Sequence, residues 1–175
     1  GRLGRVVGGV GLTRFTILEE GLMKIAGGWD HRGRRFRADV ERVLARLGHE
    51  LVDMGARTDE SSDYPDFGFR VAEAVARGEA DRGLLICGTG IGMSIVANKV
   101  AGIRAGVVTD VETARLSRAH NDTNVICIGE EAATGPELED ILHAWLTTPF
   151  DGGRHERRIK KITEYEASRG AAPKA

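Results

Sequence analysis

Short apolar runs alternate with segments of helical periodicity along most of the chain. The unbroken run at 84–87 is typical of a strand buried on both faces of a parallel sheet. Elsewhere apolar residues recur every three or four positions, which indicates helices with one buried face. The pattern predicts strands over 23–27, 51–54, 84–87, 103–108 and 125–128. It predicts helices over 33–47, 66–77, 111–119, 136–147 and 156–168, with another running from the turn at 88–92 towards residue 99.

This alternation predicts a three-layer α/β/α, Rossmann-like single domain with about five parallel strands. A length of 175 residues suits one domain. In such sheets ligands bind outside the carboxyl ends of the strands. We therefore expect Asp30 and His31, after the first strand, to lie near Cys87 and the glycine-rich turn that follows it.

The domain is expected to cover residues 23–168. Residues 1–22 are glycine-punctuated and weakly patterned, and we interpret them as a flexible extension, with Met23 as the natural start. Residues 169–175 are expected to be a frayed tail.

Composition narrows the range of partners and compartments. A formal net charge of -1 gives no reason to expect binding to nucleic acid or to an anionic membrane. No segment approaches the eighteen or so apolar residues that a spanning helix needs. Both cysteines, Cys87 and Cys127, lie in apolar runs, which indicates reduced thiols in a cytoplasmic protein.

The turn Gly88-Thr89-Gly90-Ile91-Gly92 offers the clearest candidate chemistry. Its backbone N–H groups and the helix that follows can attract an anion, although its spacing fits neither common nucleotide-binding loop. The structural alternative is a tight turn that packs the helix on the strand. Cys87 comes just before the turn, where a thiolate would be stabilised and could act as base or nucleophile. Cys127 lies mid-strand and is interpreted as structural.

Histidines and arginines supply the remaining candidates. His31 and His120 are expected to converge on the same edge of the sheet, although each can also be a solvated surface residue. Arg154 and Arg158 are four residues apart and share one face of a helix. Such a pair makes a phosphate clamp or, alternatively, a solvated helix start.

Six motifs in this order resemble ribose-5-phosphate isomerase type B, a family that also contains allose-6-phosphate and galactose-6-phosphate isomerases. The resemblance runs from residue 23 to about residue 166. It rests on Asp30-His31-Arg32-Gly33, Asp63-Tyr64-Pro65, Ile86-Cys87-Gly88-Thr89-Gly90-Ile91-Gly92, Ala97-Asn98-Lys99, His120-Asn121-Asp122-Thr123-Asn124 and Gly153-Arg154-His155.

The resemblance implies a metal-free and cofactor-free homodimer whose sites are shared between subunits, and it leaves a tetramer open. It implies that Cys87 moves a proton between carbons 2 and 1 of the sugar. The turn from Gly88 through Gly90 to Gly92, with Thr89, would hold the enediolate, and His120 would help to open the sugar ring.

The remaining positions implied by the resemblance bind the substrate. Asp30 would bind sugar hydroxyls, and His31 would bind phosphate. Arg154 and Arg158 would bind phosphate from the partner subunit. The pocket would be lined by Tyr64 and Asn121, with His155 assisting at the phosphate.

Two positions depart from the family pattern. Glu131 lies where many relatives carry an arginine that touches phosphate, which reverses the local charge. Trp29 is bulkier than the usual residue before the Asp-His pair, so it either trims the pocket or packs behind the strand.

The leading hypothesis is an aldose-ketose isomerase that interconverts ribose 5-phosphate and ribulose 5-phosphate in the pentose phosphate pathway. A close alternative is isomerisation of another aldose phosphate, a tetrose or hexose 6-phosphate. A non-catalytic sugar-phosphate-binding protein would have no need of the thiol. A cysteine-dependent hydrolase ranks lowest, because it does not explain the arginine pair.

Overall fold

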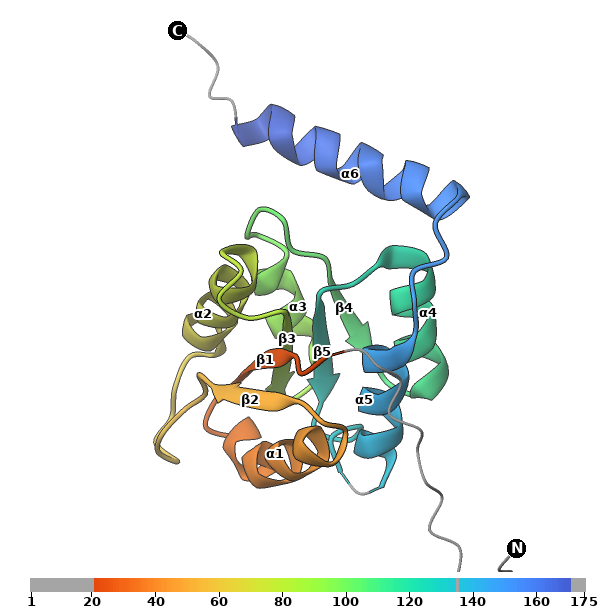
Figure 1. Cartoon of the computed structure of the whole chain (residues 1–175). Coiled ribbons are helices and arrows are strands. Elements are labelled where there is room, and N and C mark those ends of the chain that lie inside the picture. The colour runs from red at the N-terminus through yellow and green to blue at the C-terminus, as the bar shows by residue number, and fades with distance from the viewer. Residues whose placement is uncertain (1–20, 135, 171–175) are drawn as a thin grey trace, which may run out of the picture.

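The computed structural model describes residues 21–134 and 136–170. At its centre is a five-stranded sheet with the order β2-β1-β3-β5-β4 (Figure 1). All four pairings are parallel, so the carboxyl ends of the strands lie at one edge. The strands are β1 (Lys24–Trp29), β2 (Glu50–Asp53), β3 (Arg82–Cys87), β4 (Ala105–Val108) and β5 (Val125–Gly129).

Helices cover both faces of the sheet, which confirms the predicted three layers. On one face lie α2 (Tyr64–Ala76) and α3 (Ile91–Ala97). On the other lie α1 (Arg37–Arg46), α4 (Val111–Asn121) and α5 (Glu137–Thr147). Strand side chains alternate between the two cores: Ile86 packs with α1 and α5, and Cys87 packs with α2 and α3.

The first helical segment differs in detail from the sequence prediction. It opens with a 3-10 turn over Gly33–Phe36 before α1 begins. The tight start follows from Asp30, whose carbonyl accepts a hydrogen bond from the Arg34 N–H group at 3.1 Å. The local turn thus anchors the loop after β1 to the start of the helix.

The last helix, α6 (Arg154–Gly170), lies apart from the three layers, beyond the end of α4 (Figure 1). It continues to Gly170, two residues past the expected end of the domain at 168. The expected extension at 1–22 lies outside the described residues except for 21 and 22, and the expected tail at 169–175 except for 169 and 170, which belong to α6. Among the described helices, none has the length and apolar character required to cross a membrane.

The strand order creates a switch point between β1 and β3. From β1 the chain moves outward to β2, and it then returns to place β3 on the other side of β1. A crevice for ligands forms where neighbouring strands diverge in this way. The carboxyl ends of β1 and β3 carry Asp30 and Cys87, as expected from the sequence.

Candidate active site

Asp30 orders the loop that leaves β1. The residue is buried, and its Oδ1 accepts hydrogen bonds from the N–H groups of Arg32 at 3.0 Å and Gly33 at 2.9 Å. Gly33 is required here, because a Cβ would lie 2.7 Å from Cβ of Trp29 and 2.9 Å from the carbonyl oxygen of Ile86. Since both bonds use Oδ1, Oδ2 can accept a hydrogen bond from a ligand.

Trp29 does not line the crevice. Its side chain is fully buried in the core with α1 and α5, so it packs behind the strand and does not trim the pocket.

His31 is held by Ser62, in the loop before α2. The Ser62 N–H group donates to His31 Nδ1 at 3.1 Å, and the His31 N–H group donates to Ser62 Oγ at 3.1 Å. A ring nitrogen that accepts a backbone hydrogen bond carries no proton, so the proton of His31 is on Nε2. The sequence prediction missed Ser62, for which the polar loop at 58–63 was the sole signal.

The Cys87 thiol is enclosed by the turn that follows it. Only 6% of the residue is exposed, and its Sγ accepts a hydrogen bond from the Gly90 N–H group at 3.2 Å. The turn thus directs a backbone donor at the sulfur. The Ile91 N–H group donates to Thr89 Oγ1 at 3.2 Å, so the Thr89 side chain closes the turn.

Gly90, a predicted substrate contact, has a backbone conformation that favours glycine. Its φ of 77° lies in the left-handed region, and a Cβ would lie 3.2 Å from the backbone nitrogen of Gly129. Because its N–H group donates to Cys87 Sγ, Gly90 supports the thiol. Gly88 and Thr89 are exposed and remain open to a ligand.

Tyr64 forms a wall beside the turn. A Cβ on Gly92 would lie 2.8 Å from two atoms of the Tyr64 ring. Gly92 therefore makes room for this ring, which is 39% exposed at the start of α2.

Cys127 matches its structural interpretation. It is fully buried in β5, and this burial, together with the nearby Cys87 charge, raises the pKa of its thiol. A thiol held protonated in this way is a poor nucleophile.

His120 and His155 form a second cluster. His120 lies on the last turn of α4 and His155 on the first turn of α6, and their rings stack with centroids 4.2 Å apart and planes 9° apart. Between them, the Asp151 N–H group donates to the Ala119 carbonyl at 3.0 Å. Desolvation lowers the pKa of His155, and the charges of His120, Arg154 and Arg158 lower it further.

The second cluster lies at the opposite edge of the sheet from Cys87, and the expectation that His31 and His120 share an edge is wrong. Helix α4 runs back from the carboxyl end of β4, so its last residues reach the edge where β5 begins (Figure 1). At a rise of about 3.3 Å per residue, a strand of five residues separates the edges by roughly 15 Å.

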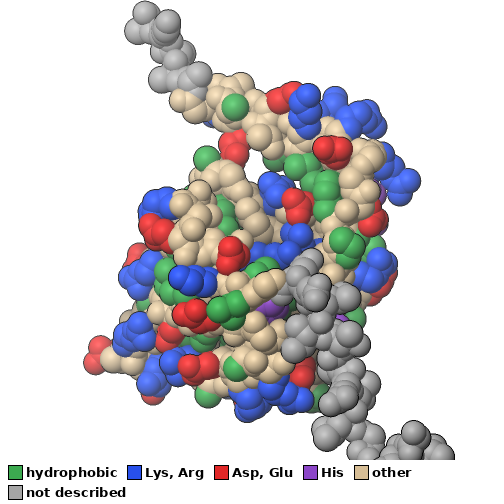
Figure 2. Space-filling model, viewed as in Figure 1, with side chains coloured by type: hydrophobic (Ala, Val, Ile, Leu, Met, Phe, Trp, Pro, Cys, Tyr) green, Lys and Arg blue, Asp and Glu red, His purple; other side chains and the backbone are tan. Residues whose placement is uncertain are grey.

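Cationic side chains surround this second cluster. Arg154 and Arg158 are exposed at the start of α6, and Figure 2 shows Lys and Arg side chains gathered over this helix. The ligand atoms of His120, Asp151 and His155 come within 4.8 Å of one another. Arg154 and Arg158 add positive charge beside His155. The cluster therefore suits an anionic ligand better than a metal cation.

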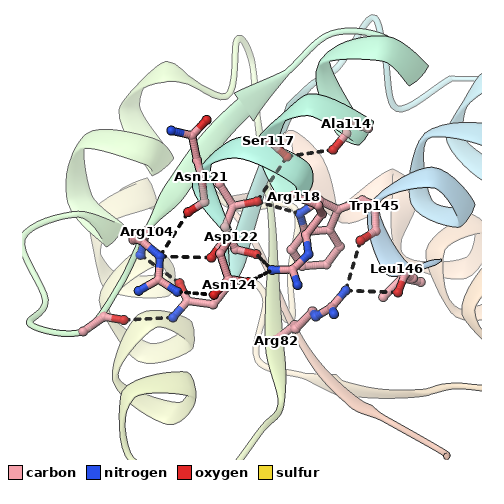
Figure 3. A network of polar contacts seen from close by, with 12 residues as sticks. Arg82, Arg104, Ala114, Ser117, Arg118, Asn121, Asp122, Asn124, Trp145 and Leu146 are labelled. Carbon is pink, nitrogen blue, oxygen red and sulfur yellow. Dashed lines mark hydrogen bonds and ion pairs between the residues drawn. The ribbon is translucent and has the colours of Figure 1, made fainter. Parts of the chain in front are cut away.

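The residues after His120 fix the end of α4 (Figure 3). Arg104 Nε donates to the carbonyls of Asn121 at 3.1 Å and Asp122 at 3.0 Å. The Asp122 carboxylate pairs with Arg104 at 3.0 Å and with Arg118 at 2.7 Å. The side chain of Asn121 points away from this network (Figure 3). His120 is thus held in place chiefly because the two residues after it contact Arg104 and Arg118.

The chain matches the family model described as Ribose/Galactose Isomerase over residues 25–162. It belongs to this family. It is 45% identical over 148 residues to ribose-5-phosphate isomerase B of Escherichia coli, which covers 85% of the chain and 99% of the relative.

Solved structures of ribose/galactose isomerase relatives have the same fold. The ribose-5-phosphate isomerase B of Clostridium thermocellum is 49% identical with a TM-score of 0.80, covering 84% of this chain and 99% of its own. The enzyme of Mycoplasma genitalium, solved with bound ribulose-5-phosphate, is 40% identical with a TM-score of 0.77, covering 82% and 96%.

Family membership confirms the resemblance found in the sequence. The matched range of 25–162 contains both clusters, from Asp30 to Arg158. The two clusters are therefore both part of the ribose/galactose isomerase domain.

Proposed function

We propose that the protein interconverts ribose 5-phosphate and ribulose 5-phosphate, with Cys87 as the base, at a site completed by a second copy of the chain. The observation that carries the proposal is the thiol of Cys87 at the switch point, with a backbone N–H group aimed at its sulfur. The relatives named ribose-5-phosphate isomerase B support ribose 5-phosphate as the substrate.

The reaction needs one base and a stabilised anion. The Cys87 thiolate takes the proton from carbon 2 of the open-chain aldose, and the electron pair moves to the carbonyl oxygen on carbon 1 to give an enediolate. The thiol returns the proton to carbon 1, and the hydroxyl proton passes from oxygen 2 to oxygen 1. Backbone donors at Gly88 and Thr89 would stabilise the enediolate, each by about 3 kcal/mol as in other oxyanion holes.

Residues on the same edge would orient the sugar. Asp30 Oδ2 would accept from a hydroxyl group, and His31 Nε2 would donate to the phosphate or to a neighbouring oxygen. Tyr64 and the turn would enclose the reacting end, which keeps water from the enediolate.

The other half of the site would come from a partner subunit. A two-fold axis can set the amino edge of one sheet against the carboxyl edge of the other, and this would create two equal sites per dimer. His120 would then assist ring opening. Arg154 and Arg158 would bind the phosphate, with Asn121 and His155 beside them. The separation of about 15 Å within one chain favours this arrangement.

The family description also favours a second substrate class. Because it covers ribose and galactose isomerases, a hexose 6-phosphate is the alternative to ribose 5-phosphate. The two free, buried thiols suit a reducing compartment, so we place the enzyme in the cytoplasm.

Turnover of ribose 5-phosphate without added metal tests the proposal. Formation of ribulose 5-phosphate would be followed by NMR for the wild type, Cys87→Ala and the matched control Cys127→Ala. We expect activity in the wild type and in Cys127→Ala, and none in folded Cys87→Ala. Equal turnover by Cys87→Ala would refute the base, and an inactive wild type that turns over a hexose 6-phosphate would refute the substrate.

A further inference from the structure

Arg32 covers the open side of the turn after β3. Its Nη1 and Cζ atoms lie 3.8 and 4.0 Å from the point that a Cβ of Gly88 would occupy. Apart from Gly88 and its chain neighbours, no other atom of the described residues lies within 4 Å of this point. The backbone of Arg32 is fixed as well, because its N–H group donates to Asp30 Oδ1 at 3.0 Å.

Glu130 orients the Arg32 side chain. Arg32 Nε lies 2.8 Å from Glu130 Oε1, and the Glu130 N–H group donates to the Gly88 carbonyl at 3.2 Å. Glu130 is the more buried partner, with 18% of its side chain exposed against 63% for Arg32. A guanidinium held through Nε keeps the N–H groups of Nη1 and Nη2 for a ligand.

The carboxylate of Glu130 also pairs with a second arginine beside the turn. Glu130 is shared between Arg32 and Arg35, each at 2.8 Å, so one carboxylate faces two guanidinium groups. Arg34 pairs with Asp59 at 2.8 Å, and is thereby balanced separately. The guanidinium of Arg35 lies over the Phe36 ring, 4.7 Å from its centroid, which leaves Arg32 as the cation beside Gly88.

Arg32 and the Cys87 side chain lie on different sides of the turn. Along β3, Cys87 packs with α2 and α3, whereas Ile86 packs with α1 and α5. By this alternation the open side of Gly88 faces the α1 side. The Arg32 guanidinium therefore lies on the face of the turn away from the Cys87 side chain, where it can meet an anionic group of a substrate without contacting the thiol.

We propose that Arg32 is a specificity-determining residue that binds the phosphate group of the sugar phosphate through Nη1 and Nη2, with Glu130 as its positioning residue. This inference rests on the proposed function for the identity of the substrate. It assigns to the chain's own subunit a phosphate contact in addition to the proposed arginines of the partner. Because Arg32 acts away from the reacting carbons, it contributes equally to substrate and transition-state binding.

Steady-state kinetics of Arg32→Ala tests the contact. We expect KM for ribose 5-phosphate to rise about tenfold with kcat little changed, as for the loss of one charge-assisted contact. Arg32→Lys should raise KM by a smaller factor than Arg32→Ala. Lysine keeps the positive charge but lacks the paired N–H donors of the guanidinium. Arg32→Ala in a Glu130→Gln background should raise KM by a smaller factor than in the wild type, because the two residues act together.

Arg35→Ala is the matched control. It removes the same charge from the same carboxylate, but its side chain lies on Phe36, so KM should stay near the wild-type value. Equal rises in KM for Arg32→Ala and Arg35→Ala would show that any positive charge near Glu130 has the same electrostatic effect. This result would overturn the proposal. An unchanged KM for Arg32→Ala, or a fall in kcat alone, would overturn it as well.

A binding measurement separates this inference from the proposed function. Inorganic phosphate should raise the Tm of the wild type, and Arg32→Ala should need about tenfold more phosphate for the same rise. This result would support Arg32 as a phosphate contact even if the protein did not turn over ribose 5-phosphate. If phosphate stabilised both proteins equally, or neither of them, Arg32 would not be a phosphate contact.

Discussion

The backbone N–H group of Gly90 donates a hydrogen bond to Cys87 Sγ at 3.2 Å, and the same glycine packs against the backbone of Gly129. One residue thus joins the thiol to the end of β5. Its φ of 77° sets the direction of the N–H group. The hydrogen bond to the thiol therefore depends on the backbone conformation of Gly90.

Replacing Gly90 with alanine should disrupt this link. A Cβ would lie 3.2 Å from backbone atoms of β5 and would strain the left-handed backbone, so we expect a loss of at least about 1 kcal/mol of stability and most of the activity. Gly78→Ala is the control, because its φ is 72° and a Cβ there would meet nothing within 4 Å. Urea unfolding and turnover of both variants check the prediction. Full activity in a folded Gly90→Ala would contradict it.

The two cysteines should differ in reactivity. Iodoacetamide is expected to modify Cys87 and abolish activity, because Cys87 lies at the edge of the sheet beside the exposed Gly88 and Thr89. Burial raises the pKa of the Cys127 thiol, so Cys127 should be modified only on unfolding. Mass spectrometry of peptides after timed alkylation measures both sites. Faster modification of Cys127 in the folded protein would contradict this prediction.

The tautomer of His31 is open to direct measurement. Since the Ser62 N–H group donates to Nδ1, nitrogen NMR should find the proton on Nε2. Ser62→Ala keeps this backbone donor and loses only the Oγ acceptor, so the tautomer should persist with a stability loss of about 1 kcal/mol. A proton on Nδ1 in either protein would rule out this arrangement.

His155 should make stability depend on pH. Desolvation holds the pKa of folded His155 below its ordinary value of 6.5, so the unfolded chain takes up the proton first as pH falls. Stability should therefore decline below about pH 6.5, until folded His155 is protonated too. His155→Gln should remove this part of the decline, as measured by Tm between pH 7.5 and pH 5. Parallel curves for the two proteins would contradict the assignment.

The layers and the thiol site could be predicted from the sequence because each depends on local pattern. The apolar run before Cys87 identifies a doubly covered strand, and the rule for parallel sheets then brings Asp30 and Cys87 to one edge. Family membership and fold were confirmed. The order of the strands was not predicted, since nothing local shows that β5 inserts between β3 and β4.

The placement of His120 failed because the same rule was not applied to helices. A helix that follows a strand runs back across the sheet, so its last residues lie at the amino edge. The contacts of His31 with Ser62 and of Arg32 with Glu130 could not be predicted from the sequence either. Each joins polar residues from loops far apart in the sequence, and neither leaves a periodic signal.

The proposed site, shared between two subunits, is tested most directly by mixing two inactive variants. Cys87→Ala and His120→Ala would each be inactive alone, and the two would be mixed, unfolded and refolded together. Random pairing makes half of the dimers mixed, each with one intact site, so about a quarter of wild-type activity should return. No recovery from a mixture shown to contain mixed dimers would place Cys87 and His120 in the same subunit's site, and would contradict the account.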